Sequence, residues 1–151
     1  MKIFTCLAIV LLMFSIKPEY SKTYYEDGVL KSEGWIIDMK KEKYWYFYHK
    51  NGRLKSKGHF RKNIKTGYWY FYNSNNKLTM EGSFENGKKS DWWKIYKSDT
   101  IEEVKYKNSQ KEGLSIYRIS GKPVKAEFYV KGKRTHEWFS LKQFRKEYPS
   151  L

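Results

Sequence analysis

The stretch "YWYFYHKNGRLKSKGHF" at residues 44–60 begins with five consecutive aromatic residues, continues through an Asn-Gly pair and ends on Phe60. An Asn-Gly pair between two strand-like runs is a strong sequence signal for a β-hairpin, because both central positions of a type I′ turn need a positive φ. Nearly the same stretch returns as "YWYFYNSNNKLTMEGSF" at residues 68–84. We therefore predict a repeated hairpin, turning in this unit at Asn51-Gly52.

The pattern recurs every 24 positions, as the spacing of Trp45, Trp69 and Trp93 shows. A fixed period of this size is the signature of an array of small structural units, each packed on its neighbours. The fourth unit is shorter, since Tyr117 follows Tyr96 after only 21 positions, and Trp138 then falls in the position of Trp93. The positions that define the repeat are Trp45, Trp69, Trp93 and Trp138, the glycines Gly34, Gly58 and Gly82, and Ile36, Phe60 and Phe84.

Counting outward from a two-residue turn gives the register of the hairpin. It places Tyr48 opposite Lys55, Tyr46 opposite Lys57 and Trp45 opposite Gly58, where the missing side chain leaves room for the indole. Because side chains alternate across a sheet, one face carries Trp45, Phe47, Leu54, Gly58 and Phe60, and in the next unit Trp69, Phe71, Leu78, Met80, Gly82 and Phe84. The opposite face carries Tyr44, Tyr46, Tyr48, Arg53, Lys55, Lys57 and His59, and in the next unit Tyr68, Tyr70, Tyr72, Lys77, Thr79 and Glu81. We call these the tryptophan face and the tyrosine face.

The ends of the chain differ from the array. Ile3 to Ile16 is an unbroken run without charged residues, preceded by Lys2 and ended by Lys17 and Pro18. The length of this run is typical of a signal peptide and short for a membrane span, so we predict a signal peptide at residues 1–19 and export, with an uncleaved N-terminal anchor as the alternative. Leu141, Phe144 and Tyr148 have helical spacing. They predict a short cap at residues 142–151.

The predicted fold is therefore all-β: an elongated antiparallel meander of about five consecutive hairpins over residues 20–141. The unit "KTGYWYFYNSNNKLTMEGSFENGK" at residues 65–88 resembles the variant MORN repeat (membrane occupation and recognition nexus). The family's pattern is matched by Gly67, Trp69, Tyr72, Lys77, Leu78, Gly82, Phe84, Gly87 and Lys88. The resemblance implies hairpin repeats. Bacterial chains of such repeats are commonly labelled YwqK-family antitoxins of toxin–antitoxin systems, which makes a cytoplasmic antitoxin one alternative for this chain.

The residues give little sign of enzymatic chemistry. Cys6 is the only cysteine and lies in the predicted leader, so the mature chain has no disulfide, cysteine nucleophile or cysteine-ligated metal. His49 and His59 fall on opposite faces of their hairpin and cannot share a metal. Asp99, Glu102 and Glu103 could serve a hydrolase, the least favoured alternative. We predict no catalytic residues, no metal and no cofactor.

The remaining prediction is a binding surface. The formal net charge is +15, which attracts polyanions in a salt-dependent way. We predict a non-enzymatic exported module that binds an unknown protein or an anionic polymer or lipid of the cell envelope; export argues against a specific nucleic acid. The alternatives are a carbohydrate- or wall-binding module using exposed aromatic rings, and a face that serves solubility alone. The candidate binding residues are Tyr46, Tyr48, Lys55, Lys57, Tyr70 and Tyr72.

Overall fold

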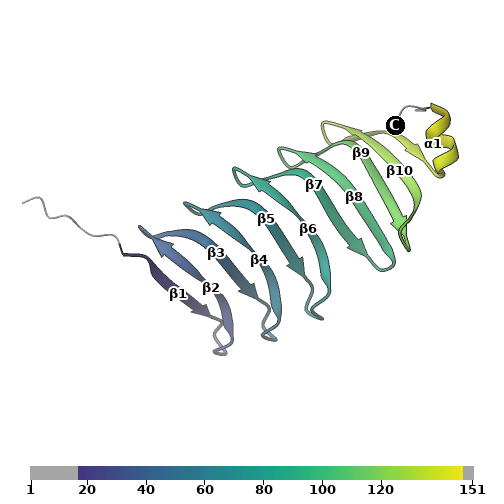
Figure 1. Ribbon diagram of the computed structural model, residues 1–151. Helices are drawn as coiled ribbons and strands as arrows, with labels where there is room; N and C mark the ends of the chain where they lie inside the picture. The colour runs from purple at the N-terminus through teal and green to yellow at the C-terminus, as the bar shows by residue number, and fades with distance from the viewer. Residues whose placement is uncertain (1–16, 148–151) are drawn as a thin grey trace, which may run out of the picture.

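The computed structural model describes residues 17–147 and contains a single open sheet of eleven antiparallel strands, in the order in which they follow one another along the chain (Figure 1). This confirms the predicted meander of hairpins. Residues 1–16, most of the predicted signal peptide, and Tyr148 lie outside the described residues. The elements are β1 (Glu19–Tyr24), β2 (Leu30–Ile37), β3 (Lys40–Tyr48), β4 (Leu54–Arg61), β5 (Ile64–Tyr72), β6 (Leu78–Glu85), β7 (Lys88–Lys97), β8 (Thr100–Lys107), β9 (Gln110–Ile119), β10 (Lys122–Val130), β11 (Lys133–Trp138) and α1 (Leu141–Glu147).

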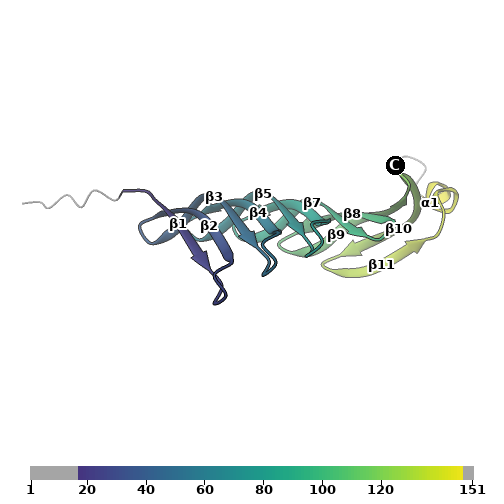
Figure 2. The same ribbon diagram turned by 90° about the horizontal axis from the view of Figure 1, so that it is seen from below.

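The sheet is one layer thick, twisted and elongated, as Figure 2 shows from its edge. The helix α1 packs on β10 and β11 at the C-terminal end, which confirms the short cap. Its first turn is capped by the Ser140 hydroxyl, which accepts a hydrogen bond from the Gln143 backbone N–H at 3.1 Å. Within residues 17–147, no helix is both long and apolar enough to span a membrane.

The hairpin turn at Asn51-Gly52 is longer than the predicted type I′ turn. Of these two residues only Gly52 has a positive φ, at 76°. Hydrogen bonds run from the Gly52 N–H to the His49 carbonyl (2.9 Å) and from the His49 N–H to the Arg53 carbonyl (2.8 Å). This is the other common hairpin loop, in which a turn is followed by one left-handed residue. A two-residue turn of the predicted type does occur elsewhere, at Ser120-Gly121, where both φ values are positive (49° and 77°).

The longer loop shifts the register near the turn. Trp45, Tyr46 and Phe47 pair with Gly58, Lys57 and Ser56, as predicted. Beyond them a β-bulge makes Tyr48 pair with Leu54, so Lys55 is an extra residue without a cross-strand partner. The predicted pair of Tyr48 and Lys55 is therefore wrong.

The same bulge recurs in the neighbouring units, with Lys31 in β2 and Thr79 in β6 as the extra residues. Leu78 pairs with Tyr72 as Leu54 does with Tyr48, and residues directly opposite in a ladder share a face. Both leucines consequently lie on the tyrosine face, which corrects their predicted place.

The tryptophans join one unit to the next. Trp45, Trp69 and Trp93 are completely buried, and the Trp69 indole lies over Gly58, where an added Cβ would stand 2.3 Å from the ring. The register prediction of Trp45 opposite Gly58 holds, but the ring that fills the space above Gly58 comes from the following unit. The Trp69 indole N–H donates to the carbonyls of His59 (3.2 Å) and Thr66 (3.3 Å), which draws the ring over the preceding strand.

Trp138 does not occupy the position of Trp93. Trp93 pairs with Val104, and the direct pairs continue through Ser115 and Glu127 to Glu137, so these residues share one face. Trp138, next to Glu137, points to the other face, where it is buried with Ala126 and Phe144. The reason is the shortened fourth unit. An even repeat interval returns a side chain to the same face, whereas the odd interval between Tyr96 and Tyr117 reverses it.

Turns along one edge of the sheet are tied to each other. The backbone N–H groups of Asn63, Gly87, Ser109 and Gly132 donate to the carbonyls of Lys41, Lys65, Lys89 and Lys111, at 2.9 to 3.1 Å. Each bond links a turn to the unit before it. The four lysines are thereby held at equivalent positions of successive units.

Candidate binding surfaces

Part of the predicted site is assembled on the tyrosine face. Lys57 pairs with Tyr46 on one side and Tyr70 on the other, and its ammonium lies 5.1 Å from the centre of the Tyr70 ring. Tyr48 and Tyr72 lie on the same face. The Tyr48 hydroxyl donates to Glu33 at 2.6 Å, and burial together with that bond raises the pKa of Tyr48 well above its usual value. Tyr48 therefore has a structural partner.

The sixth predicted binding residue, Lys55, is on the other face. As the extra residue of its bulge it lines a hollow together with Phe47 and Ser56, which belong to the tryptophan face. The structure thus separates Lys55 from Tyr46 and Lys57.

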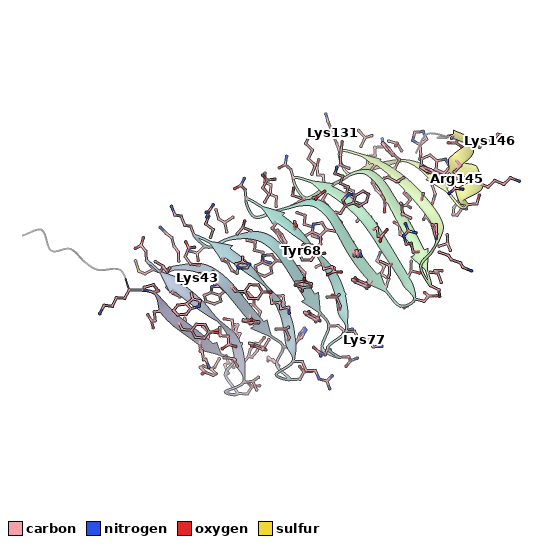
Figure 3. All side chains as sticks on the ribbon, viewed as in Figure 1. Lys43, Tyr68, Lys77, Lys131, Arg145 and Lys146 are labelled. Atoms are coloured by element: carbon pink, nitrogen blue, oxygen red, sulfur yellow. The ribbon has the colours of Figure 1, made fainter. Side chains whose placement is uncertain are left out.

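The tyrosine face also carries a row of aromatic rings, none of which was among the predicted binding residues. Tyr20, Tyr44, Tyr68 and Trp92 follow one another at the period of the repeat; Tyr20, Tyr68 and Trp92 are 43%, 42% and 46% exposed, and Tyr44 is half-buried. They stand on β1, β3, β5 and β7, every second strand, which sets them about 9.5 Å apart along the sheet. Figure 3 labels Tyr68 on β5 near the middle of the sheet. The signal was present in the sequence, since these positions share the repeat.

The aromatic row borders an open hollow of about 450 Å³ between β5 and β9. Tyr68, Trp92 and Ile116 give it apolar walls. Its charged residues are one lysine and two carboxylates: Lys94, Asp91 and Glu103. Trp92 follows Asp91, whose φ of 59° belongs to an irregularity in the ladder with β6. Planar rings beside a few polar groups can stack on a flat ligand such as a sugar ring.

The tryptophan face is covered by lysine side chains. The Lys41 ammonium lies 5.0 Å from the centre of the Trp45 ring and 5.6 Å from those of Phe47 and Phe60. Lys65 repeats this arrangement over Trp69 at 4.4 Å, and Lys89 over Trp93 at 4.3 Å. These cation–π contacts cover rings that no second layer shields, so the buried tryptophans need no opposing sheet.

A hollow of about 290 Å³ lies on the tryptophan face between β2 and β5. Four lysines line it, over a floor that contains Phe47 and Phe60; we call it the four-lysine hollow. Its lysines are Lys31, Lys41, Lys55 and Lys65.

Farther along the same face, from β8 to β11, two buried carboxylates replace the aromatic rings. Glu102 accepts hydrogen bonds from Ser115 (3.2 Å) and Tyr117 (3.1 Å) and pairs with Lys111. Glu127 is bonded by Tyr117, Tyr129, Lys125 and Arg134 at 2.6 to 2.8 Å. Burial alone would raise the pKa of Glu127, but these four bonds outweigh it and hold the pKa well below the usual range.

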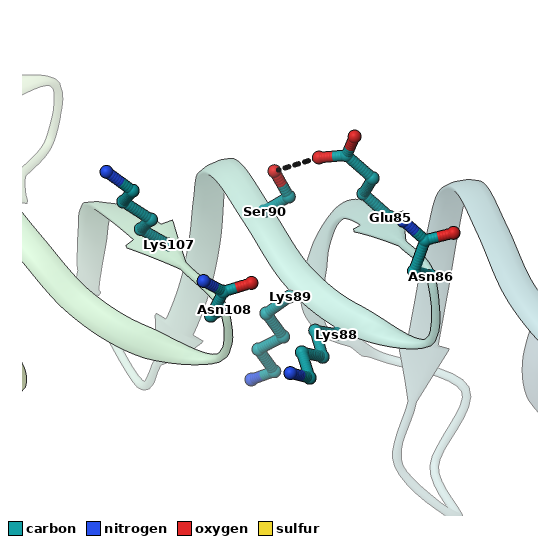
Figure 4. A pocket seen from close by; sticks show the side chains of 7 residues that line it. All are labelled: Glu85, Asn86, Lys88, Lys89, Ser90, Lys107 and Asn108. Carbon is teal, nitrogen blue, oxygen red and sulfur yellow. Dashed lines mark hydrogen bonds between the residues drawn. The ribbon is translucent and has the colours of Figure 1, made fainter.

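A third hollow, of about 330 Å³, lies between the β6–β7 turn and the β8–β9 turn (Figure 4). Ser90 donates to Glu85 at 3.3 Å on one side of β7, while the amino groups of Lys88 and Lys89 point to the other side. These polar groups do not converge on a common point.

The residues considered for enzymatic chemistry are dispersed. Glu102 and Glu103 point to opposite faces, Glu103 pairing with Arg118 at 2.9 Å. The His49 Nε2 lies 3.0 Å from the Tyr72 carbonyl, and the His59 ring packs edge-on against Tyr44. In the described part of the chain, no three His, Cys, Asp or Glu side chains are grouped so as to hold a metal ion.

Comparison of the chain with models of known protein families gives no match, and comparison with curated proteins gives none either.

Proposed function

We propose that the protein is a non-enzymatic, exported binding or scaffold module of the MORN-repeat type, which holds a macromolecular partner at the cell envelope. The observation that carries the proposal is the recurrence of the same side chains at one-unit intervals along uncovered faces of a long sheet, above all Tyr20, Tyr44, Tyr68 and Trp92. A partner that extends along several units engages all of them, and no single unit has to bind tightly. Export rests on the apolar run of residues 3–16.

The test is cross-linking in cells that express the full chain. A photoreactive phenylalanine analogue replaces Tyr70 on the tyrosine face, and a matched chain carries it at Met39, an exposed turn position. We expect the Tyr70 chain to fractionate with the envelope and to cross-link a macromolecule there, and the Met39 chain to give much less product. Recovery of the protein in the cytoplasm with residues 1–16 attached, or equal products from both positions, would contradict the proposal.

One observation favours a carbohydrate-binding module as a second candidate. Successive rings of the row stand about 9.5 Å apart, close to the length of a disaccharide in an extended β-linked glycan, and a ring can stack on the flat face of a sugar. Stacking withstands salt, whereas charge attraction is screened. Sedimentation with insoluble wall glycan at high salt therefore tests it. The Tyr68→Ala/Trp92→Ala variant should lose binding and the Ile119→Ala/Val130→Ala variant should keep it; binding that salt abolishes in all proteins excludes this candidate.

A further inference from the structure

The four-lysine hollow includes two of the predicted binding residues, Tyr48 and Lys55, but lies over the tryptophan face and away from Tyr46, Lys57 and Tyr70. Lys41 and Lys65 are half-buried against aromatic rings, while Lys31 and Lys55 are exposed at its rim. Tyr25, Tyr48 and Ser56 also line it, and the Tyr25 hydroxyl donates to the Tyr48 carbonyl at 2.8 Å. No Asp or Glu among the described residues lines the hollow.

Two of the lysines are brought to the hollow by bulges. Lys31 and Lys55 are the extra residues in β2 and β4, between the pairs Thr23–Ser32 and Tyr24–Leu30 and between the pairs Phe47–Ser56 and Tyr48–Leu54. In regular alternation each would point away from the buried serine that follows it. A bulge redirects a side chain, and here it adds a lysine to the face that already carries Lys41 and Lys65.

The charge in this hollow is not compensated by the protein. Among residues 17–147, none of the four lysines forms an ion pair with a carboxylate. On the same face from the end of β7 onward, Lys97, Lys111, Lys125 and Arg134 each do, with Glu102, Glu127 or Glu137. Burial and the neighbouring Lys89 lower the pKa of Lys65, so the positive charge there is held at a cost to folding. A bound anion would offset that cost.

The residue types suit a phosphate ligand. Lysine offers a compact charge with three donors on a flexible stem, which can reach the oxygens of a phosphate from several directions, and it is a common phosphate ligand. The hollow is lined by lysines alone among cationic residues. Lys65 also covers Trp69, Phe71 and Phe84 of the next unit, and Lys89 follows one unit later. The cations thus continue along the face at intervals of about 9.5 Å, which suits a chain of anionic groups.

We propose that the four-lysine hollow binds a phosphate group of a linear phosphodiester polymer, whose neighbouring phosphates follow the lysines along the tryptophan face. This inference rests on the proposed function, in that it names the class of the partner.

The test measures binding of the full chain to a labelled oligomer of abasic deoxyribose phosphate, a phosphodiester chain without bases, by fluorescence anisotropy over a series of salt concentrations. The Lys31→Gln/Lys55→Gln variant should bind at least about tenfold more weakly, with a salt slope lower by about 1.4, since each lost phosphate contact on a single strand contributes about 0.7. The matched control is Lys22→Gln/Lys105→Gln, which removes the same charge from exposed positions of the tyrosine face. Its affinity should fall much less. Equal losses in the two variants would overturn the proposal.

Further arms separate the sources of anionic groups. Polyglutamate of equal charge should bind more weakly than the phosphodiester oligomer; equal binding overturns the preference for phosphate. The claim that the ligand is a polymer is overturned by either of two results. One is displacement of the oligomer by inorganic phosphate at an equal phosphate concentration, and the other is tighter binding to phosphatidylglycerol vesicles than to the oligomer. Unchanged thermal unfolding of both variants shows that the fold is intact. If the Tyr70 cross-link forms in the envelope and the lysine variants bind the oligomer normally, only the proposal of phosphate binding in the four-lysine hollow is refuted. If the oligomer binds as expected and the cross-link does not form, only the proposed function at the envelope is refuted.

Discussion

Replacing Gly58 with alanine probes the contact that joins two units of the sheet. The added methyl group would stand 2.3, 2.4 and 2.5 Å from three atoms of the Trp69 indole. These separations are more than about 1 Å shorter than the optimal distance between two carbon atoms. The indole is fully buried, bonded through its N–H to two carbonyls, and packed against Phe60 with ring centres 5.1 Å apart. It therefore has no free space into which to move.

Overpacking of this kind costs about 1–3 kcal/mol, offset by about 0.5–1 kcal/mol from the lower entropy of the unfolded alanine chain. We expect a net loss of about 1 kcal/mol in the free energy of unfolding. The protein itself supplies the counterexample: Val104 stands at the position equivalent to Gly58, and its neighbour on the following strand is Ser115 in place of a tryptophan. In a Trp69→Ser background, Gly58→Ala should accordingly be neutral or slightly stabilising.

The measurement is a double-mutant cycle in urea, with Gly58→Ala, Trp69→Ser and the two combined. The coupling energy should be about 2 kcal/mol, the overpacking cost that Trp69→Ser removes, and larger than that of the matching cycle with Trp45→Ser, because Trp45 lies over Gly34. Additive effects, or stronger coupling to Trp45 than to Trp69, would refute the account of how the units are joined.

Two further perturbations follow from the turns and the buried network. Met39→Gly should raise the free energy of unfolding by about 1 kcal/mol, because Met39 is 89% exposed and has a φ of 55°, a strained value for any residue with a Cβ; Met39→Ala keeps the strain and should show no such gain in urea unfolding. Glu127→Gln should cost about 1–3 kcal/mol at pH 7, because it removes the charge of a buried carboxylate that accepts from Tyr117 and Tyr129, while Lys125 and Arg134 keep their ion pairs with Glu137. The pKa of Glu127 is lowered by folding, so its contribution is complete above the unfolded pKa of about 4.3 and is lost as the pH falls below it, where the unfolded chain binds the proton first. Urea unfolding from pH 7 to pH 3 should therefore show a smaller loss of stability in the variant; an unchanged slope would contradict the role of Glu127.

Much of the fold could be predicted because the repeat is long and regular. Five aromatic residues before a turn, returning after 24 positions, fix the strands, the meander and the central pairs of each hairpin. The turn was less certain, since an Asn-Gly pair suits both a two-residue turn and a longer loop in which only Gly52 is left-handed. That one difference moved Lys55 and Leu54 to the opposite faces. The reversal of Trp138 follows from the odd spacing of Tyr96 and Tyr117 in the sequence, combined with the alternation of side chains.

The candidate sites were only partly within reach of the sequence. Tyr46, Lys57 and Tyr70 were brought together by pairs near the middle of the hairpin, where the register is secure. The row of aromatic rings from Tyr20 to Trp92 recurs at the 24-residue period, so the sequence period alone could have identified it. The four-lysine hollow could not, because it depends on where the bulges place their extra residues.

The joint between Gly58 and Trp69 also bears on how a protein of this kind changes its length. The same contact occurs three times, with Gly34 beneath Trp45, Gly58 beneath Trp69 and Gly82 beneath Trp93, and the three contacts are interchangeable. Deletion of residues 43–66 would bring Gly34 under Trp69 and recreate the glycine–tryptophan contact that was removed. Genetic recombination can therefore shorten or lengthen such a chain by whole repeats, and each remaining contact between neighbouring repeats keeps the same packing.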